Sequence, residues 1–135
     1  MLKDFFDFSK LGGDFSALID NIKKRKRCSI CGMGQSEKVI SSLNATGKVL
    51  YIASDFSNAK KAYDLFECLL KDSAYLLPPA GDFLTYKNSQ TVENNVQRIK
   101  TIYALTNSKA DVVCTCAEAL LSYLPNRERF KNKNR

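Results

Sequence analysis

The sequence predicts an α/β domain in which a parallel sheet of about four strands carries helices on both faces. Three observations support this fold class. Short apolar runs alternate along the chain with segments whose apolar residues recur at helical spacing. The run 48–53, K-V-L-Y-I-A, is continuously apolar, as expected for a strand that helices cover on both faces. The connections between runs are long enough for right-handed crossovers between parallel strands.

The chain has the size and composition of one soluble domain. Its 135 residues can bury a single core, and 44% apolar with 26% charged residues is typical of globular proteins. No apolar run approaches the roughly 18 residues of a membrane helix, and the N-terminus lacks the order of a signal peptide. We expect a cytoplasmic protein without membrane contact, with an arm over 1–13, a domain over 14–125 and a basic tail or linker start over 126–135.

The first predicted helix begins with Asp14 as its N-cap and ends at a run of lysines and arginines, whose charges suit the negative end of the helix dipole. Its inner face carries apolar residues at helical spacing, namely Phe15, Leu18, Ile19 and Ile22. A short apolar strand is expected over 27–31. The helix that follows it turns Val39, Ile40 and Leu43 inwards.

After the strand 48–53, Ser54 is expected to cap a helix that continues to Leu70. A third strand is expected over 73–77, because it is a short apolar run that ends at a pair of prolines. The irregular loop that leaves it continues to about Gln90.

The last predicted helix of normal length covers 91–105. Its inner face is expected to consist of four apolar residues, Val92, Val96, Ile99 and Tyr103. Its outer face is expected to carry polar residues, Glu93, Asn94, Gln97, Arg98 and Lys100. A fourth strand over 111–116 and a short helix over 117–123 complete the domain before Pro125.

The stretch 27–40, R-C-S-I-C-G-M-G-Q-S-E-K-V-I, has the outline of a phosphate-binding loop. Such loops run G-x-x-x-x-G-K-[ST] between a strand and a helix. Their glycines let backbone N–H groups surround a phosphate, their lysine reaches the outer phosphates, and their hydroxyl binds Mg²⁺. Gly32 matches the opening glycine and Lys38 the lysine, but Glu37 replaces the second glycine and Val39 the hydroxyl.

These two replacements argue against nucleotide binding. Like charges about 4 Å apart repel by roughly 1 to 4 kcal/mol, and Val39 has no oxygen for a hard cation. Three interpretations stay open: a turn that never met a phosphate, a degenerate phosphate-binding loop, and a working one. The candidate nucleotide-binding residues, which we expect to be inactive, are Gly32, Gly34, Ser36 and Lys38.

The formal net charge of +7 is concentrated in two runs. The first consists of Lys23, Lys24, Arg25, Lys26 and Arg27. The second crowds the C-terminus and consists of Arg127, Arg129, Lys131, Lys133 and Arg135. Such runs suit nucleic acid or another acidic partner, but a solvated helix end and a tail would explain them as well. The first run is therefore a candidate nucleic-acid contact.

Five cysteines and the absence of histidine limit the chemistry of the chain. Cys28 and Cys31 with Cys114 and Cys116 could form a four-thiolate zinc site, or the first pair a redox pair. However, the second pair lies in an apolar strand and is expected to pack in the core. The segment 32–34 separates the first pair from the following helix, so we expect that pair to be structural too. We predict no metal and no catalytic residue, since Ser-His and Cys-His arrangements are excluded.

Five stretches, taken in order, resemble one known family. They are I-C-G-M-G-Q-S-E-K-V at 30–39, V-L-Y-I-A-S-D-F-S-N-A-K-K-A-Y-D-L at 49–65, Y-L-L-P-P-A-G-D-F-L-T-Y at 75–86, N-V-Q-R-I-K-T-I-Y-A-L-T-N at 95–107 and A-D-V-V-C-T-C-A-E-A-L-L-S-Y-L-P at 110–125. Together they resemble the first domain of bacterial transcription-repair coupling factors, called Mfd. The N-terminal module of that family is similar to the excision-repair protein UvrB.

The resemblance implies a role in DNA repair. Coupling factors recognise RNA polymerase stalled at a DNA lesion, displace it with an ATP-driven translocase and recruit UvrA through the UvrB-like module. The chain would then be a non-catalytic scaffold fragment that needs no cofactor. ATP and magnesium would belong to motor domains outside it, and UvrA mainly to the adjacent domain. The alternative from another class is a small P-loop-like nucleotide-binding protein or ATPase, and a third is a stand-alone basic DNA-binding domain.

The resemblance also carries residue-level implications. The family loop derives from the UvrB P-loop without its activity, so Gly32, Gly34, Ser36 and Lys38 would inherit the place of a nucleotide site but not its function. Arg98 matches a recurrent family arginine, which is expected in a structural ion pair. Pro79 is followed by Ala-Gly-Asp, where the family often has an aromatic residue and an acid, so a partner contact by this loop is open.

Overall fold

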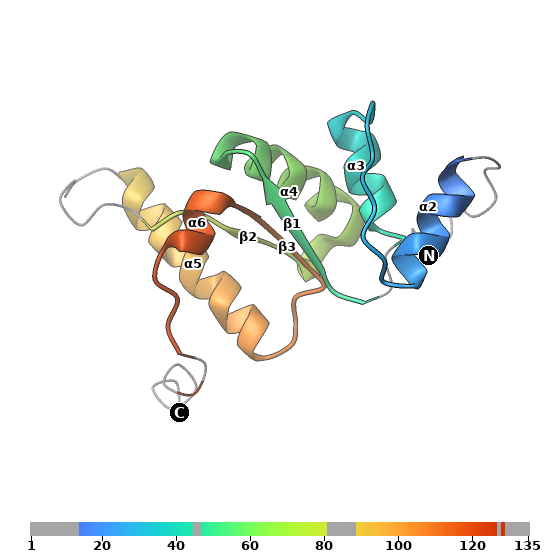
Figure 1. Cartoon of the computed structure of the whole chain (residues 1–135). Coiled ribbons are helices and arrows are strands. Elements are labelled where there is room, and N and C mark those ends of the chain that lie inside the picture. Colours follow the sequence, from blue (N-terminus) through green and yellow to red (C-terminus); the bar gives the residue numbers. More distant parts are fainter. Residues whose placement is uncertain (1–13, 45–46, 81–88, 127, 129–135) are drawn as a thin grey trace.

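The computed structural model describes residues 14–44, 47–80, 89–126 and 128 (Figure 1). Its elements in chain order are α2 (Asp14–Lys23), α3 (Gln35–Ser42), β1 (Val49–Ala53), α4 (Phe56–Leu70), the short 3-10 helix η2 (Lys71–Ser73), β2 (Ala74–Leu77), α5 (Ser89–Thr106), β3 (Val112–Cys116) and α6 (Ala117–Leu121). The predicted arm over 1–13, the loop residues 81–88 and most of the predicted basic tail lie outside the described residues.

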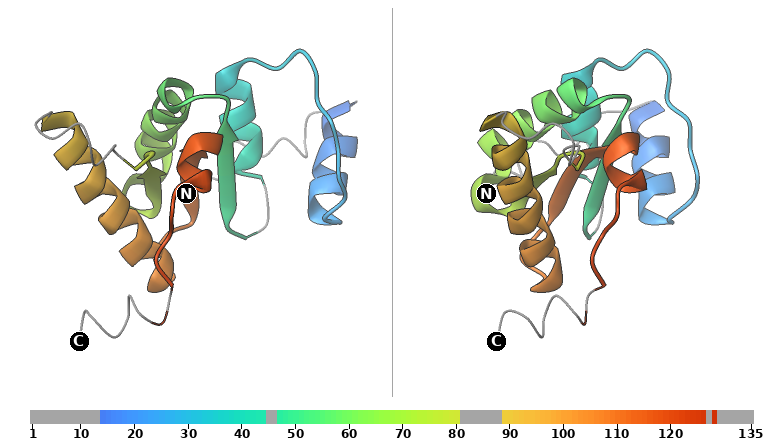
Figure 2. Two further views of the ribbon diagram at one scale, coloured as in Figure 1. Left: turned by 60° about the vertical axis from the view of Figure 1, so that its left-hand side comes forward. Right: turned by 90° about the vertical axis from the view of Figure 1, so that its left-hand side faces the viewer.

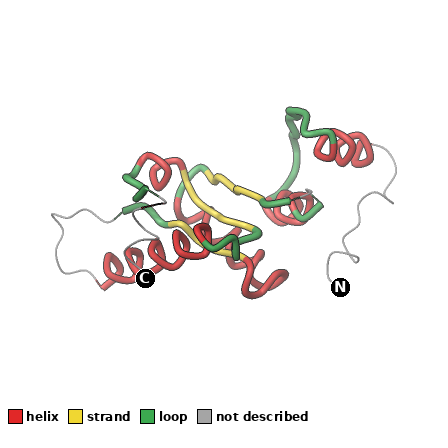
Figure 3. The backbone as a smooth tube through the Cα atoms, turned by 90° about the horizontal axis from the view of Figure 1, so that it is seen from below, coloured by secondary structure: helices red, strands yellow, loops and turns green. Residues whose placement is uncertain are grey.

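Three parallel strands form the sheet in the order β1-β3-β2 (Figure 3). Val112 of β3 is in register with Val49 of β1 on one side and with Ala74 of β2 on the other. The strands predicted over 48–53, 73–77 and 111–116 are therefore confirmed, as is the α/β class with a parallel sheet. Within the described residues the sheet has three strands, whereas the sequence predicted about four.

The two faces of the sheet contribute to two apolar clusters. On one face, α3 and α4 bury the larger cluster, which includes Val39, Phe66 and Cys114. On the other face, α5 covers β2 and β3 with a smaller cluster that includes Leu77, Ala104 and Val113. Alternate residues of each strand point to opposite faces, which is why neighbouring residues of β3 belong to different clusters. Figure 1 shows α4 and α5 on opposite sides of the strands.

The strand predicted over 27–31 is wrong. The segment is extended but has no strand partner in the described part of the chain, and all of its residues are exposed. It lies near α2, where Leu18 and Asn21 line a cavity together with residues 28–33. The physical reason is that Ile30, its only large aliphatic side chain, stays 45% exposed. Pairing of the segment therefore gains little burial here.

The orientation predicted for the helix over 91–105 is also wrong. In α5 the four apolar residues assigned to the inner face are exposed, from 46% for Val96 to 65% for Val92. The sheet instead receives Arg98, Thr101 and Ala104, which are buried at 6%, 0% and 2% exposure. Small and hydrogen-bonding side chains let the helix approach the strands closely, and this outweighs the apolar periodicity.

The hydrogen bonds of Arg98 explain why this charged residue faces the interior of the domain. One guanidinium nitrogen, Nη1, donates to the carbonyl oxygen of Pro78 at 2.6 Å and, more weakly, to that of Ala119 at 3.5 Å. The other, Nη2, donates to the carbonyl oxygen of Tyr123 at 3.2 Å. Arg98 therefore ties the end of β2 to α6 through backbone carbonyls, not through the ion pair that the sequence predicted. Burial lowers the pKa of its guanidinium.

Candidate functional site

The P-loop-like segment 27–34 joins α2 to α3. Gly32 has a φ of +78°, a left-handed conformation that glycine adopts without steric cost. Gly34 is the N-cap of α3, and no side chain caps the helix there. The segment therefore turns into a helix as a phosphate-binding loop does, but a helix rather than a strand leads into it.

The carboxylate of Glu37 lies against the start of α3. A Cβ added at Gly34 would collide with Glu37 Oε2, so the carboxylate sits directly beside the N-cap. Acidic groups in the first turn of a helix interact favourably with its dipole, which gives Glu37 a structural reason for this position. A phosphate would approach the same turn for the same reason. It would meet a negative charge there.

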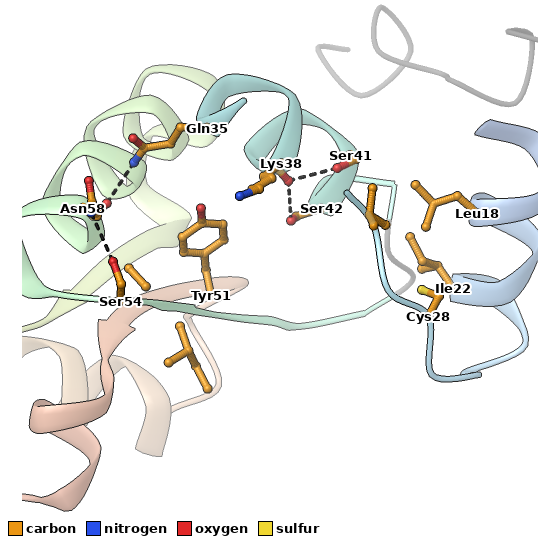
Figure 4. Close-up of a pocket in the computed structure, with 13 residues that line it drawn as sticks. Leu18, Ile22, Cys28, Gln35, Lys38, Ser41, Ser42, Tyr51, Ser54 and Asn58 are labelled. Carbon is orange, nitrogen blue, oxygen red and sulfur yellow. Dashed lines mark hydrogen bonds between the residues drawn. The ribbon is translucent and has the colours of Figure 1, made fainter. Parts of the chain in front are cut away.

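Lys38 borders a cavity of about 570 Å³ between α2, α3 and the carboxyl end of β1 (Figure 4). Its side chain is exposed and extends towards Tyr51 in that view. The hydroxyls of Ser41 and Ser42 donate to the backbone carbonyl oxygen of Lys38 at 3.0 and 2.7 Å. These bonds do not involve the Lys38 side chain. The ammonium group has no hydrogen-bond or ion-pair partner among the described residues.

The first turn of α4 forms the opposite wall of this cavity. Its N-cap is Asp55 rather than the predicted Ser54, and Asp55 Oδ1 accepts the backbone N–H of Asn58 at 2.9 Å. Ser54 donates its hydroxyl to Asp55 Oδ2 at 2.8 Å. The Asn58 N–H above all, and then the Ser54 hydroxyl, lower the pKa of Asp55. Gln35 joins the two walls by donating Nε2 to the Asn58 carbonyl oxygen at 3.0 Å.

The four predicted nucleotide-site residues do not converge on one pocket. Gly34 and Lys38 are adjacent, because the Lys38 N–H donates to the Gly34 carbonyl oxygen at 3.2 Å. Lys38 lines the cavity next to β1, whereas Gly32 lines a different cavity of about 530 Å³ beside α2. Ser36 is exposed and lines neither.

The predicted basic contacts, residues 23–27, are all exposed at the C-terminal end of α2. The chain turns there with Arg25 at a φ of +54°. The Arg25 N–H donates to the Ile22 carbonyl oxygen at 3.0 Å and the Lys26 N–H to that of Asn21 at 2.9 Å. This is the hydrogen-bond pattern of a Schellman helix end. Their positive charges lie at the C-terminal end of α2, where they complement the helix dipole. None of the five residues lines either cavity.

Sequence reasoning missed the polar wall opposite Lys38. Its members Ser54 and Asn58 follow β1 closely in the sequence. Loops at the carboxyl ends of parallel strands are where open α/β sheets usually bind ligands. The pattern S-D-F-S-N after an apolar strand was therefore an available signal.

The cysteines divide into two classes. Cys114 and Cys116 are buried in β3, which confirms their predicted packing role. Cys28 and Cys31 are exposed, so the structural role expected for that pair finds no support in burial. Burial raises the pKa of Cys114 to about 12, which keeps its thiol protonated at neutral pH. No group of three acidic, cysteine or histidine residues in the described ranges is arranged to hold a metal ion.

We expect a thiol reagent to label three cysteines of the native protein quickly, namely the exposed Cys28, Cys31 and Cys68. The two buried thiols should react only after unfolding, because the reagent cannot reach them in the folded protein. Ellman's reagent with and without denaturant measures this, and Cys68→Ser should reduce the fast count by one. Fast labelling of Cys68 alone would contradict the free, exposed state of Cys28 and Cys31.

Similarity to known proteins adds to this geometry. No protein-family profile and no solved structure matches the chain. The transcription-repair-coupling factor of Bacillus subtilis (strain 168) is 27% identical to it over 131 residues. That match covers 93% of this chain but only 11% of the Bacillus protein. In the described ranges, no helix is long and apolar enough to cross a membrane. The resemblance to transcription-repair coupling factors that the sequence predicts is thereby confirmed over nearly the whole chain.

Proposed function

We propose that this chain is a non-catalytic α/β scaffold of a transcription-repair coupling factor. The observation that carries the proposal is the similarity to the Bacillus coupling factor over 93% of the chain. The larger protein would displace RNA polymerase stalled on damaged DNA and recruit UvrA. ATP and magnesium would be bound by motor domains outside this chain, and UvrA mainly by the adjacent domain. The exposed run 23–27 is the surface that this proposal assigns to DNA phosphates.

Two features of α3 support a scaffold rather than a nucleotide site. The Glu37 carboxylate lies beside Gly34, where it opposes a phosphate. Val39, at the place of the Mg²⁺-binding hydroxyl, is fully buried in the cluster that contains Phe66. Its side chain contributes to the core and offers no oxygen to a cation. The residues at both departures from the P-loop pattern therefore have structural roles.

We expect millimolar Mg-ATP to leave the unfolding midpoint of the chain unchanged. A ligand at about 100 times its dissociation constant would stabilise the fold by roughly 2.7 kcal/mol, which raises the midpoint of a domain of this size on the order of 10 °C. Thermal melts with and without Mg-ATP distinguish an unchanged unfolding midpoint from a raised one. Lys38→Ala is the matched variant and should behave as the parent does.

One observation favours the nucleotide-binding alternative. The unpartnered Lys38 ammonium borders a cavity whose other wall is polar. A midpoint increase that Lys38→Ala abolishes would replace the scaffold proposal with this alternative. Mixing the purified chain with UvrA tests the partner assignment separately. Retention of UvrA by this chain alone would contradict the assignment of that contact to the adjacent domain.

A further inference from the structure

The outward side of α5 carries an apolar stripe, which consists of Val92, Val96, Ile99 and Tyr103 and is called the outer stripe below. Their exposed fractions are 65%, 46%, 58% and 48%. Consecutive members are four, three and four positions apart. This is the spacing of the a and d positions of a coiled coil, which places all four side chains along one seam.

The outer stripe takes no part in the core of the domain. At 3.6 residues per turn, it lies on the side of α5 opposite the buried Arg98, Thr101 and Ala104. In the left view of Figure 2, α5 forms one border of the molecule, with the sheet on its other side. A large partner can therefore reach the outer stripe without any rearrangement of the described elements.

Two opposite charges flank the outer stripe on the same side. Glu93 and Lys100 follow Val92 and Ile99 directly, which puts them at equivalent positions two turns apart. Seven residues of helix span about 10.5 Å, too far for the two side chains of one helix to form an ion pair. Neither forms a salt bridge or side-chain hydrogen bond with another residue that the structure describes.

We propose that the outer stripe binds a second copy of this chain, with the two α5 helices antiparallel. A two-fold axis at the level of Gln97 and Arg98 places Val96 opposite Ile99 of the second copy. It also places Val92 opposite Tyr103 of the second copy. Every stripe residue then meets an apolar residue, as an isologous interface requires.

The flanking charges select the antiparallel orientation. With that axis, Glu93 lies two positions, about 3 Å along the helix, from the level of Lys100 of the second copy, which is within reach of an ion pair. The two-fold symmetry repeats the ion pair between Glu93 and Lys100, so the dimer contains it twice. In a parallel pair, residues of the same number lie at the same level, so the acid and the base of opposite helices stay two turns apart. Charge complementarity therefore favours a second copy over an unspecified apolar ligand.

The interface is small, because stable associations usually bury about 800 Å² on each partner. We therefore expect a concentration-dependent dimer. Sedimentation equilibrium of the full chain, from low micromolar to near-millimolar concentration, should show the mass rising from 15.2 kDa towards twice that value. Ile99→Ser removes a side chain that contributes to two layers and should raise the dimer dissociation constant at least tenfold. Leu121→Ser is the matched control, because Leu121 is an apolar residue that is 88% exposed outside the stripe.

Charge reversal tests the orientation. Glu93→Lys alone, or Lys100→Glu alone, places like charges across the seam and should weaken the dimer severalfold at low salt. The double variant Glu93→Lys with Lys100→Glu restores opposite charges and should recover the parent affinity. A monomer at every concentration, with native circular dichroism, would overturn the proposal and leave the stripe to another polypeptide. A dimer that Ile99→Ser leaves unchanged, or single reversals that the double variant does not rescue, would also overturn it.

Discussion

Replacing Arg98 by alanine should lower the free energy of unfolding by at least about 3 kcal/mol, because it removes the charged donor of the two shorter hydrogen bonds, to the carbonyl oxygens of Pro78 and Tyr123, each worth about 1.5 to 3 kcal/mol. Arg98 is 6% exposed, and its guanidinium donates hydrogen bonds to the carbonyl oxygens of Pro78, Ala119 and Tyr123. Without it, these carbonyls must find water or stay unpaired. The midpoint of thermal unfolding should fall on the order of 10 °C.

Arg98→Lys should recover only part of this loss. A lysine ammonium is a single point of donation and cannot reproduce the spread of two guanidinium nitrogens over three carbonyls. Lys109→Ala is the matched control, because Lys109 is exposed just after the same helix and should change stability by less than about 0.5 kcal/mol. Chemical denaturation of the three variants gives the comparison. Equal stability of Arg98→Ala and the parent would show that the carbonyls need no guanidinium.

Replacing Phe66 by alanine should destabilise the domain by about 4 kcal/mol, the usual range for a buried phenylalanine being about 3 to 5. The side chain of Phe66 is fully buried where α4 packs on the sheet. Its ring contacts Tyr51 of β1 edge to face, with ring centroids 5.8 Å apart and an interplanar angle of 71°. The substitution leaves a cavity and removes this aromatic contact.

Phe66→Leu should cost clearly less, because most of the volume is kept. Lys61→Ala, at an exposed position of the same helix, should be close to neutral. Urea titrations followed by circular dichroism measure all three. A loss below about 1 kcal/mol for Phe66→Ala would mean that the contact between α4 and the sheet is not the centre of the core.

The strands were predictable because their signal is local. The runs that become β1, β2 and β3 are apolar, contain β-branched or aromatic residues, and end at turn or helix-start signals. Their continuous apolar runs indicate strands, but the expectation that helices cover both faces of β1 is wrong, because Leu50 and Ile52 are 55% and 54% exposed on one face. The segment 27–31 also reads as a short apolar run in the sequence. It does not pair, although β1 and β2 each have an edge without a strand neighbour among the described residues, because Ile30 is its only large aliphatic side chain and pairing gains little burial.

The orientation of α5 could not be predicted from apolar periodicity. Periodicity identifies the most apolar side of a helix, and here that side faces outwards. The inner side is chosen by bonds between Arg98 and backbone carbonyls that are distant in sequence, together with the hydroxyl of Thr101, which donates to the Leu76 carbonyl oxygen of β2 at 2.5 Å. An arginine and a threonine on one side of a helix look polar in a sequence. Their burial becomes apparent only from the acceptors that surround them.

The candidate site was predictable in outline only. The sequence identified Glu37 and Val39 as the residues that argue against a phosphate site, and in the structure Glu37 lies beside Gly34 and Val39 is fully buried. It did not indicate that Gly32 and Lys38 line different cavities, because the path of a loop between two helices has no periodic signal.

The position of β3 in the sheet affects how the chain folds as the ribosome makes it. Every strand pair in the sheet includes β3, which is the last of the three strands to be synthesised. Until residues 112–116 have left the exit tunnel, β1 and β2 are both present but lack the neighbour that each pairs with. From the synthesis of residue 77 to that of residue 116, the nascent chain therefore holds two apolar strands with unpaired backbone groups, and sheet formation follows as one late event.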